Sequence, residues 1–372
     1  MMAVTALIAC GPGQPPSSAA SSGRHTASSS PEAAPYAVLV SGVQVGNTPT
    51  YTASIVSTNG QIVSYTTAAN PNSQSAPWQP LPLVSTSASR VYYLDGRNSV
   101  RFLKPDGTTG LALQLPIQSD ERGVFAVSAD DSKIAVSVFN LRSGMRLVVA
   151  NMAASPAWHQ VFATTAFSEW PVGWRGNELV LAIGYVSGGQ QTCAICYLSP
   201  VGYHIADADT GSRSATVCTT TSSQAQLPSG PPSLAGVICE TATKLGPNGQ
   251  WIESSLAIAH WDGSTVPVRP ASCVISSGPL ALSPDGQSFA GERDVANCVP
   301  GNTIYVFDDG GRDHGTAAVT TSHPWVLWID SGHFCYETDN DQSNILDVAA
   351  NKFSAVGATG LCLATIPGGL GS

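Results

Sequence analysis

The chain is 372 residues long; 43% of its residues are hydrophobic, enough for a large core, and only 11% carry a charged side chain. Its formal net charge of −9 comes from scattered acidic residues, and the sequence contains no cluster of Lys and Arg. We therefore expect no nucleic-acid partner, because proteins that bind nucleic acids carry a basic patch or stripe.

Residues 1–10 read MMAVTALIAC. The last four, Leu7-Ile8-Ala9-Cys10, resemble the lipobox of bacterial lipoproteins, a family in which the cysteine becomes the lipidated first residue of the mature protein. The segment departs from that family because no basic residue precedes its apolar run and the run is short, as a start codon assigned too late would explain. The resemblance implies a signal-peptide remnant and a lipid on Cys10 as the sole membrane contact; the alternative is an arbitrary apolar N-terminus.

Residues 11–35 are rich in Ser, Ala, Pro and Gly and have no apolar face. Such a segment cannot bury enough surface to offset the entropy lost on ordering. We therefore expect a flexible tether here, followed by a single folded domain over residues 36–372.

The segment PLALSPDGQSFAGE, residues 279–292, predicts a β-hairpin. Pro284 presets φ for the first corner of its turn, and Gly286 accepts a positive φ. Similar patterns predict further hairpins of this first type at residues 86–94, 125–138, 172–184, 244–252 and 326–337.

A second type of hairpin follows each hairpin of the first type, with turns centred near residues 60, 107, 155, 210, 262, 310 and 351. A repeat of about 40–50 residues built from two hairpins is typical of a β-propeller blade. The segments LSPDGQSFAG and VSADDSKIAV moreover resemble the TolB-type, WD-like repeat of bacterial propellers. That resemblance covers residues 36–366 and implies a propeller, but it implies little about activity, because propellers host unrelated functions.

We predict an all-β propeller with seven blades, with six as the alternative because residues 217–252 are irregular. The first blade lacks an innermost strand, and residues 361–366 are expected to supply it by pairing with residues 36–43. Such pairing of the two terminal strands closes the ring and removes exposed sheet edges. A pair of β-sandwiches is the other all-β arrangement, but the near-constant repeat favours the propeller.

Nine cysteines are present, and if Cys10 carries the lipid, eight remain for four disulfides in an oxidising compartment. The expected pairs are Cys273–Cys298, Cys218–Cys239, Cys335–Cys362 and Cys193–Cys196. The first two would each join the loop that enters a blade to the loop that crosses it, and the third would tie the last blade to the closing strand. The spacing of Cys193 and Cys196 also suits a redox motif or half of a zinc site, but no helix start and no second pair follow.

No catalytic residue, metal ligand or cofactor is predicted, because the sequence has no nucleophile elbow, P-loop or dinucleotide fingerprint. Residues 337–344 alternate acids as a calcium loop does, but they lack its glycine and final acid. The long connections, residues 187–202, 217–236, 271–278 and 293–302, are expected to share one face and to form the partner surface.

Three hypotheses follow for function. In the first, a monomeric propeller is exported, anchored by its lipid at the cytoplasmic membrane's outer face or the cell surface, and binds a protein or glycan of the envelope. In the second, it is an extracellular hydrolase or lyase whose central funnel carries two carboxylates or a histidine. In the third, it is an accessory or sensing component of an envelope system.

Overall fold

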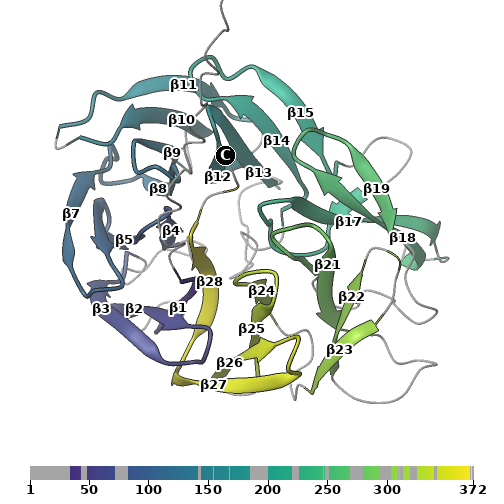
Figure 1. Cartoon of the computed structure of the whole chain (residues 1–372). Helices are drawn as coiled ribbons and strands as arrows, with labels where there is room; N and C mark the ends of the chain where they lie inside the picture. Colours follow the sequence, from purple (N-terminus) through teal and green to yellow (C-terminus); the bar gives the residue numbers. More distant parts are fainter. Residues whose placement is uncertain are drawn as a thin grey trace, which may run out of the picture. The chain divides into compact units, whose positions relative to one another are not determined.

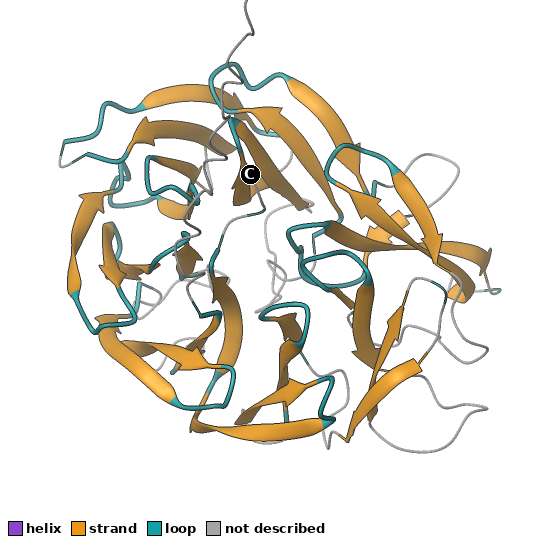
Figure 2. Cartoon of the chain, in the orientation of Figure 1, coloured by secondary structure: helices purple, strands orange, loops and turns teal. Residues whose placement is uncertain are grey.

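The structure is a computed structural model, and its regular elements are all β-strands over the part of the chain that it describes (Figure 2). Ala34–Ser372 form one compact unit, separate from Met1–Ala33. The described residues are 34–42, 48–71, 83–140, 144–153, 155–166, 168–184, 200–219, 226–245, 247, 251–268, 280–292, 303–308, 310, 313–318, 325–338, 342–368 and 370. Within these ranges no helix is long and apolar enough to cross a membrane.

Seven four-stranded antiparallel sheets form the blades of a β-propeller, and Figure 1 shows them arranged in a ring. From the innermost strand outward, blade 1 is β28 (Leu361–Ile366), β1 (Tyr36–Ser41), β2 (Thr50–Ser57) and β3 (Ile62–Ala69); blade 2 is β4 (Val84–Thr86), β5 (Val91–Asp95), β6 (Ser99–Leu103) and β7 (Thr109–Gln114); blade 3 is β8 (Arg122–Val127), β9 (Lys133–Asn140), β10 (Gly144–Asn151) and β11 (His159–Thr164); blade 4 is β12 (Ser168–Arg175), β13 (Glu178–Gly184), β14 (Gly202–Asp207) and β15 (Arg213–Val217). Blade 5 is β16 (Gln226–Pro228), β17 (Gly236–Leu245), β18 (Trp251–His260) and β19 (Thr265–Val268); blade 6 is β20 (Ala281–Leu282), β21 (Ser288–Glu292), β22 (Thr303–Asp308) and β23 (Asp313–Ala318); blade 7 is β24 (Val326–Trp328), β25 (His333–Glu337), β26 (Gln342–Asp347) and β27 (Lys352–Thr359).

The ring closes within blade 1, where β28 pairs antiparallel with β1. The register places Val38 opposite Ala364 and Val40 opposite Leu361 (Figure 1, where purple β1 lies beside yellow β28). This arrangement confirms both the predicted seven blades and the predicted closure, and it excludes the six-bladed alternative. Both terminal strands gain a hydrogen-bonded neighbour, so neither leaves an open edge at the closure.

The core is divided among the joints between neighbouring blades. Seven hydrophobic clusters each draw buried side chains from adjacent blades. At the joint of blades 7 and 1, for example, Ile345 and Val356 pack in one cluster with Leu39 and Val56. The flat apolar faces of the sheets thereby cover one another around the ring, which is how a propeller buries its blades.

The inner turns repeat the same side-chain chemistry in different blades. Between β20 and β21 the Ser283 hydroxyl donates to Asp285 Oδ1 at 2.6 Å, and the amide of Ser288 donates to Ser283 Oγ at 2.9 Å. Between β8 and β9 the Ser128 hydroxyl donates to Asp130 Oδ1 at 2.7 Å. Hydrogen bonds from the hydroxyls of Ser128 and then Ser132 lower the pKa of Asp130 to about 2. These turns confirm that a Ser-x-Asp pattern marks the hairpin joining the first two strands of a blade.

Two sequence predictions in blade 5 were wrong. Residues 244–252 join β17 to β18, the second and third strands, whereas the pattern had assigned them to the first two. The first two strands are joined instead by residues 229–235. Residues 217–236 are consequently not one long connection, because they contain the short strand β16. A Pro-Asn-Gly turn suits any tight hairpin, so it does not reveal which two strands of a blade it connects.

Candidate functional site

The innermost strands of five blades line a cavity of about 180 Å³. Its wall comes mainly from β4, β8, β12, β24 and β28, with further residues from β13, β14, the loops beside them and the segment that follows β28. Four aromatic side chains contribute: Phe125, Trp170, Tyr203 and Trp325. Prolines and leucines supply much of the remaining wall: Pro171, Pro200, Pro231, Pro232, Leu327, Leu363 and Leu370.

The cavity wall is uncharged over the residues that the structure describes. No Asp, Glu, His, Lys, Arg, Asn or Gln is among these lining residues. Tyr203 is the one titratable group in that wall, and burial raises the pKa of its hydroxyl well above the ordinary value. The two carboxylates or the histidine that a funnel hydrolase or lyase needs are thus not found among the described lining residues.

Two hydrogen-bonding groups in this wall have no partner within the described part of the chain. The indole Nε1 of Trp170 and the hydroxyl of Tyr203 are both buried and unbonded. Trp170 is 7% exposed and Tyr203 is fully buried, and both line the cavity from blade 4. Buried polar groups are nearly always paired, so these two are exceptions, and the packing around both atoms closes them off from the cavity.

Two residues after β28, Gly368 and Leu370, are among those that line the cavity. The amide of Gly368 donates to the carbonyl of Ser87 at 2.8 Å, and the amide of Leu370 donates to the carbonyl of Trp174 at 3.2 Å. Ser87 directly follows β4, and Trp174 lies near the end of β12. The chain therefore passes from the innermost strand of blade 1 to those of blades 2 and 4.

A buried ionic cluster lies within blade 4 and contacts blade 3 through Phe162. Glu169 is fully buried, and its carboxylate pairs with His204 Nδ1 and with Arg213, whose Nη2 lies 2.9 Å from both carboxylate oxygens. The guanidinium of Arg213 also lies 5.1 Å from the ring centroid of Phe162 in β11. Glu169 is not among the residues that line the cavity, and its ion pairs join strands β12, β14 and β15 within one blade. Sequence analysis missed this cluster because its members come from three separate strands and form no local motif.

The predicted cysteines fall into two groups. Cys218–Cys239 and Cys335–Cys362 are disulfides, with Cα–Cα distances of 5.4 and 6.3 Å. Cys239 lies within β17 and not in a crossing loop, so its bond ties the end of blade 4 to the second strand of blade 5. The remaining cysteines, Cys10, Cys193, Cys196, Cys273 and Cys298, lie outside the described residues, as do large parts of the predicted partner surface.

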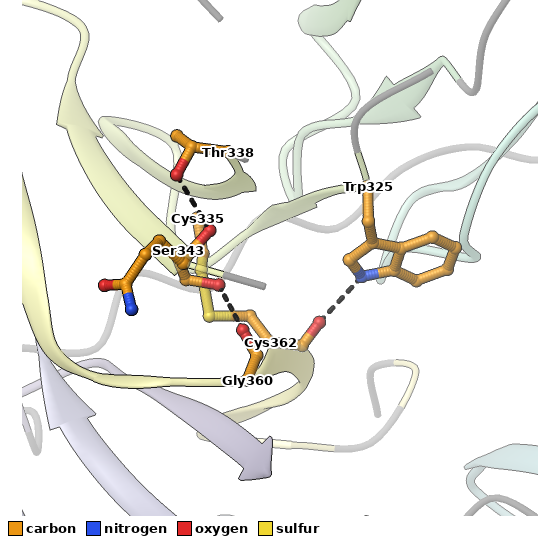
Figure 3. Close-up of a disulfide and its surroundings, with 7 residues drawn as sticks. Trp325, Cys335, Thr338, Ser343, Gly360 and Cys362 are labelled. Atoms are coloured by element: carbon orange, nitrogen blue, oxygen red, sulfur yellow. Dashed lines mark hydrogen bonds between the residues drawn. A yellow bond between two sulfur atoms is a disulfide. The ribbon is translucent and has the colours of Figure 1, made fainter. Parts of the chain in front are cut away.

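The second disulfide joins blade 7 to the closing strand, as expected, and Figure 3 shows its surroundings. The Trp325 indole donates to the carbonyl of Cys362 at 2.7 Å. The Ser343 hydroxyl donates to the carbonyl of Gly360 at 2.6 Å. No group of three or more His, Cys, Asp or Glu side chains that could hold a metal ion occurs among the described residues.

No protein-family model matches the chain, and no curated protein is significantly similar to it. Among solved structures, oligogalacturonate lyase from Vibrio parahaemolyticus is similar at 10% identity, with 82% of this chain and 88% of that chain covered and a TM-score of 0.49. Apo AztD from Citrobacter koseri is similar at 11% identity, with 91% and 99% covered and a TM-score of 0.45. TolB from Acinetobacter baumannii is similar at 11% identity, with 87% and 79% covered and a TM-score of 0.42. Likeness at this level leaves open what this chain binds.

Proposed function

We propose that this protein is an exported, lipid-anchored propeller that acts as a binding scaffold at the cell surface. The observation that carries the proposal is the central cavity, whose described wall is aromatic, proline-rich and uncharged. A mostly apolar, preformed cavity is typical of a binding site. The residues described in its wall include no pair of groups between which a proton could be exchanged during a reaction.

Two further observations support the exported location. The two inter-blade disulfides suit an oxidising compartment, because thiols in the bacterial cytoplasm are kept reduced. Leu7-Ile8-Ala9-Cys10 resembles a lipobox, which would supply the membrane anchor. A lipid, a tether and a rigid ring together would present the cavity to a partner in the envelope.

Cell fractionation tests the anchor. Cys10→Ser should move the protein from the membrane pellet to the soluble exported fraction, because the thiol that would carry the lipid is lost. Ser17→Ala, a change in the expected tether, serves as the control and should leave the protein in the pellet. Retention of Cys10→Ser in the pellet, or recovery of the wild-type protein from the cytoplasm, contradicts the proposal.

A further inference from the structure

We infer that the outer rim of blades 7, 1 and 2 lies against the headgroup region of the lipid bilayer that holds the protein. This inference rests on the proposed anchoring and names the surface of the propeller that faces the membrane. We call this surface the rim patch; it consists of the exposed apolar side chains of β27, β3 and β7, which are Phe353, Ile62, Val63, Tyr65 and Leu111.

Exposed large apolar side chains are concentrated in the rim patch. Seven such side chains occur among the described residues, and five of them belong to the patch; the other two, Leu234 and Val266, lie in blade 5. Tyr65 and Phe353 are the most exposed of the seven, at 68% and 62%. A single exposed apolar side chain is ordinary, but a group of them on adjacent elements indicates a contact surface.

The three strands form one continuous rim, and Figure 1 shows β27, β3 and β7 following one another along the outside of the ring. A β carbon added at Gly60, in the turn before β3, would lie 2.6 Å from the carbonyl oxygen of Ala355 in β27. On the other side of β3, the Ser64 hydroxyl donates to the carbonyl of Lys104, before the turn that leads into β7, at 2.9 Å. The patch therefore extends across two joints between blades.

The chemistry of the patch suits the headgroup level of a bilayer. β3 and β7 contain no charged residue, and β27 contains only Lys352. All three are outermost strands, so each pairs with another strand of its sheet on one side only. Open strand edges do not occur in the hydrocarbon core, but water and headgroups at the interface can bond them. A tyrosine ring, apolar with a polar tip, is typical of that level.

The chain enters the propeller close to the rim patch. Tyr36, the first residue of β1, pairs with Ser57, and Val56 pairs with Ile62, the first residue of β3. Neighbouring strands lie about 4.8 Å apart, so this entry point is about 10 Å from β3.

That entry point favours a bilayer over other partners for the patch. A flexible tether of the length expected for residues 11–35 spans about 25–30 Å on average. A lipid on Cys10 would thus keep blade 1 near the bilayer, and a weak contact is enough at the resulting high effective concentration.

Vesicle sedimentation with the full-length Cys10→Ser protein tests the inference, because this protein lacks the lipid and its folded surface alone can bind. It should bind phosphatidylcholine vesicles reversibly at high lipid concentration. Sodium chloride at about 0.5 M should not weaken the binding, because the patch strands contribute a single charge. A contact of this kind does not replace a lipid anchor, so Cys10→Ser still leaves the washed membrane pellet of cells.

Substitutions in the Cys10→Ser protein locate the contact. Tyr65→Ser and Phe353→Ser should each lower the vesicle partition coefficient about threefold to tenfold, because each removes a largely exposed ring. Val266→Ser is the matched control: it changes an apolar residue that is 42% exposed on β19, an outermost strand outside the patch, and should bind as its parent does. The unfolding midpoints of all three variants should stay near that of the parent, because the side chains are exposed.

Failure of the Cys10→Ser protein to bind vesicles overturns the inference, and so do equal partition coefficients for the parent and the three variants. Analytical ultracentrifugation without vesicles tests a different occupant. A dimer that Tyr65→Ser and Phe353→Ser convert to monomers would reassign the patch to a contact between two copies of the chain and would overturn the inference as well. Cell fractionation remains a separate measurement, so failure of the lipid anchor is distinct from failure of the rim contact.

Discussion

Two joints between neighbouring blades, that of blades 3 and 4 and that of blades 7 and 1, are held together by different contacts. In each, an indole donates across the joint: Trp174 Nε1 to the carbonyl of Ala126 at 3.0 Å, and Trp325 Nε1 to the carbonyl of Cys362 at 2.7 Å. The first joint adds the guanidinium of Arg213, which lies 5.1 Å from the ring centroid of Phe162, and the second adds the disulfide Cys335–Cys362.

The difference reflects what each joint must hold. The ring is closed through β28, which is held on one side by its ladder to β1 and on the other by the disulfide to β25. A covalent bond is suited to that place because it restricts the unfolded chain and does not depend on neighbouring charges. Blades 3 and 4 take no part in closure, and their joint relies on the Trp174 indole, on buried apolar side chains and on the contact of Arg213 with the Phe162 ring.

The largest expected effect comes from breaking the ionic cluster of blade 4. Arg213→Met should lower the free energy of unfolding by about 3–5 kcal/mol, because it strips the principal cation from a fully buried carboxylate. Arg175→Met is the control: its guanidinium lies 3.9 Å from Glu178 in an exposed pair, whose loss should cost at most about 1 kcal/mol. Denaturant unfolding under oxidising conditions measures both variants. If the two lose the same stability, the Glu169 cluster does not stabilise blade 4 more than an exposed ion pair does.

Removing the disulfide of the closing joint should have a somewhat smaller effect. The double variant Cys335→Ala/Cys362→Ala frees a loop with a sequence separation of 27 and should lose about 3.5 kcal/mol. The pair Cys218→Ala/Cys239→Ala, with a separation of 21, should lose nearly the same from loop entropy alone. Any excess loss at the closing joint therefore measures the contribution of ring closure. Equal losses in the two double variants would show that β28 is held well enough by its ladder to β1.

The sequence predicted the ring of blades but not the central cavity, because the turns form through local contacts and the cavity does not. Ser283 and Asp285 form their turn through contacts two to five residues apart, so a local pattern was enough to find it. The closure was predicted because one innermost strand was missing at one end of the chain and one strand was left over at the other. Trp170, Tyr203 and Leu370 meet only after the blades are assembled, and nothing near any of them in the chain indicates a shared cavity.

The smallest expected effect distinguishes the two indole bonds that the joints share. Trp174 is 2% exposed, so Trp174→Phe leaves the carbonyl of Ala126 buried without its donor, and we expect a loss of about 1–3 kcal/mol. Trp325 is only partly buried and lines the cavity, so water can replace its indole at the carbonyl of Cys362. Trp325→Phe should then cost about 1 kcal/mol or less, as measured by denaturant unfolding with the disulfide intact. A loss at Trp325 as large as that at Trp174 would mean that the closing joint depends on its indole as much as the joint of blades 3 and 4 does, and that the disulfide does not relieve that dependence.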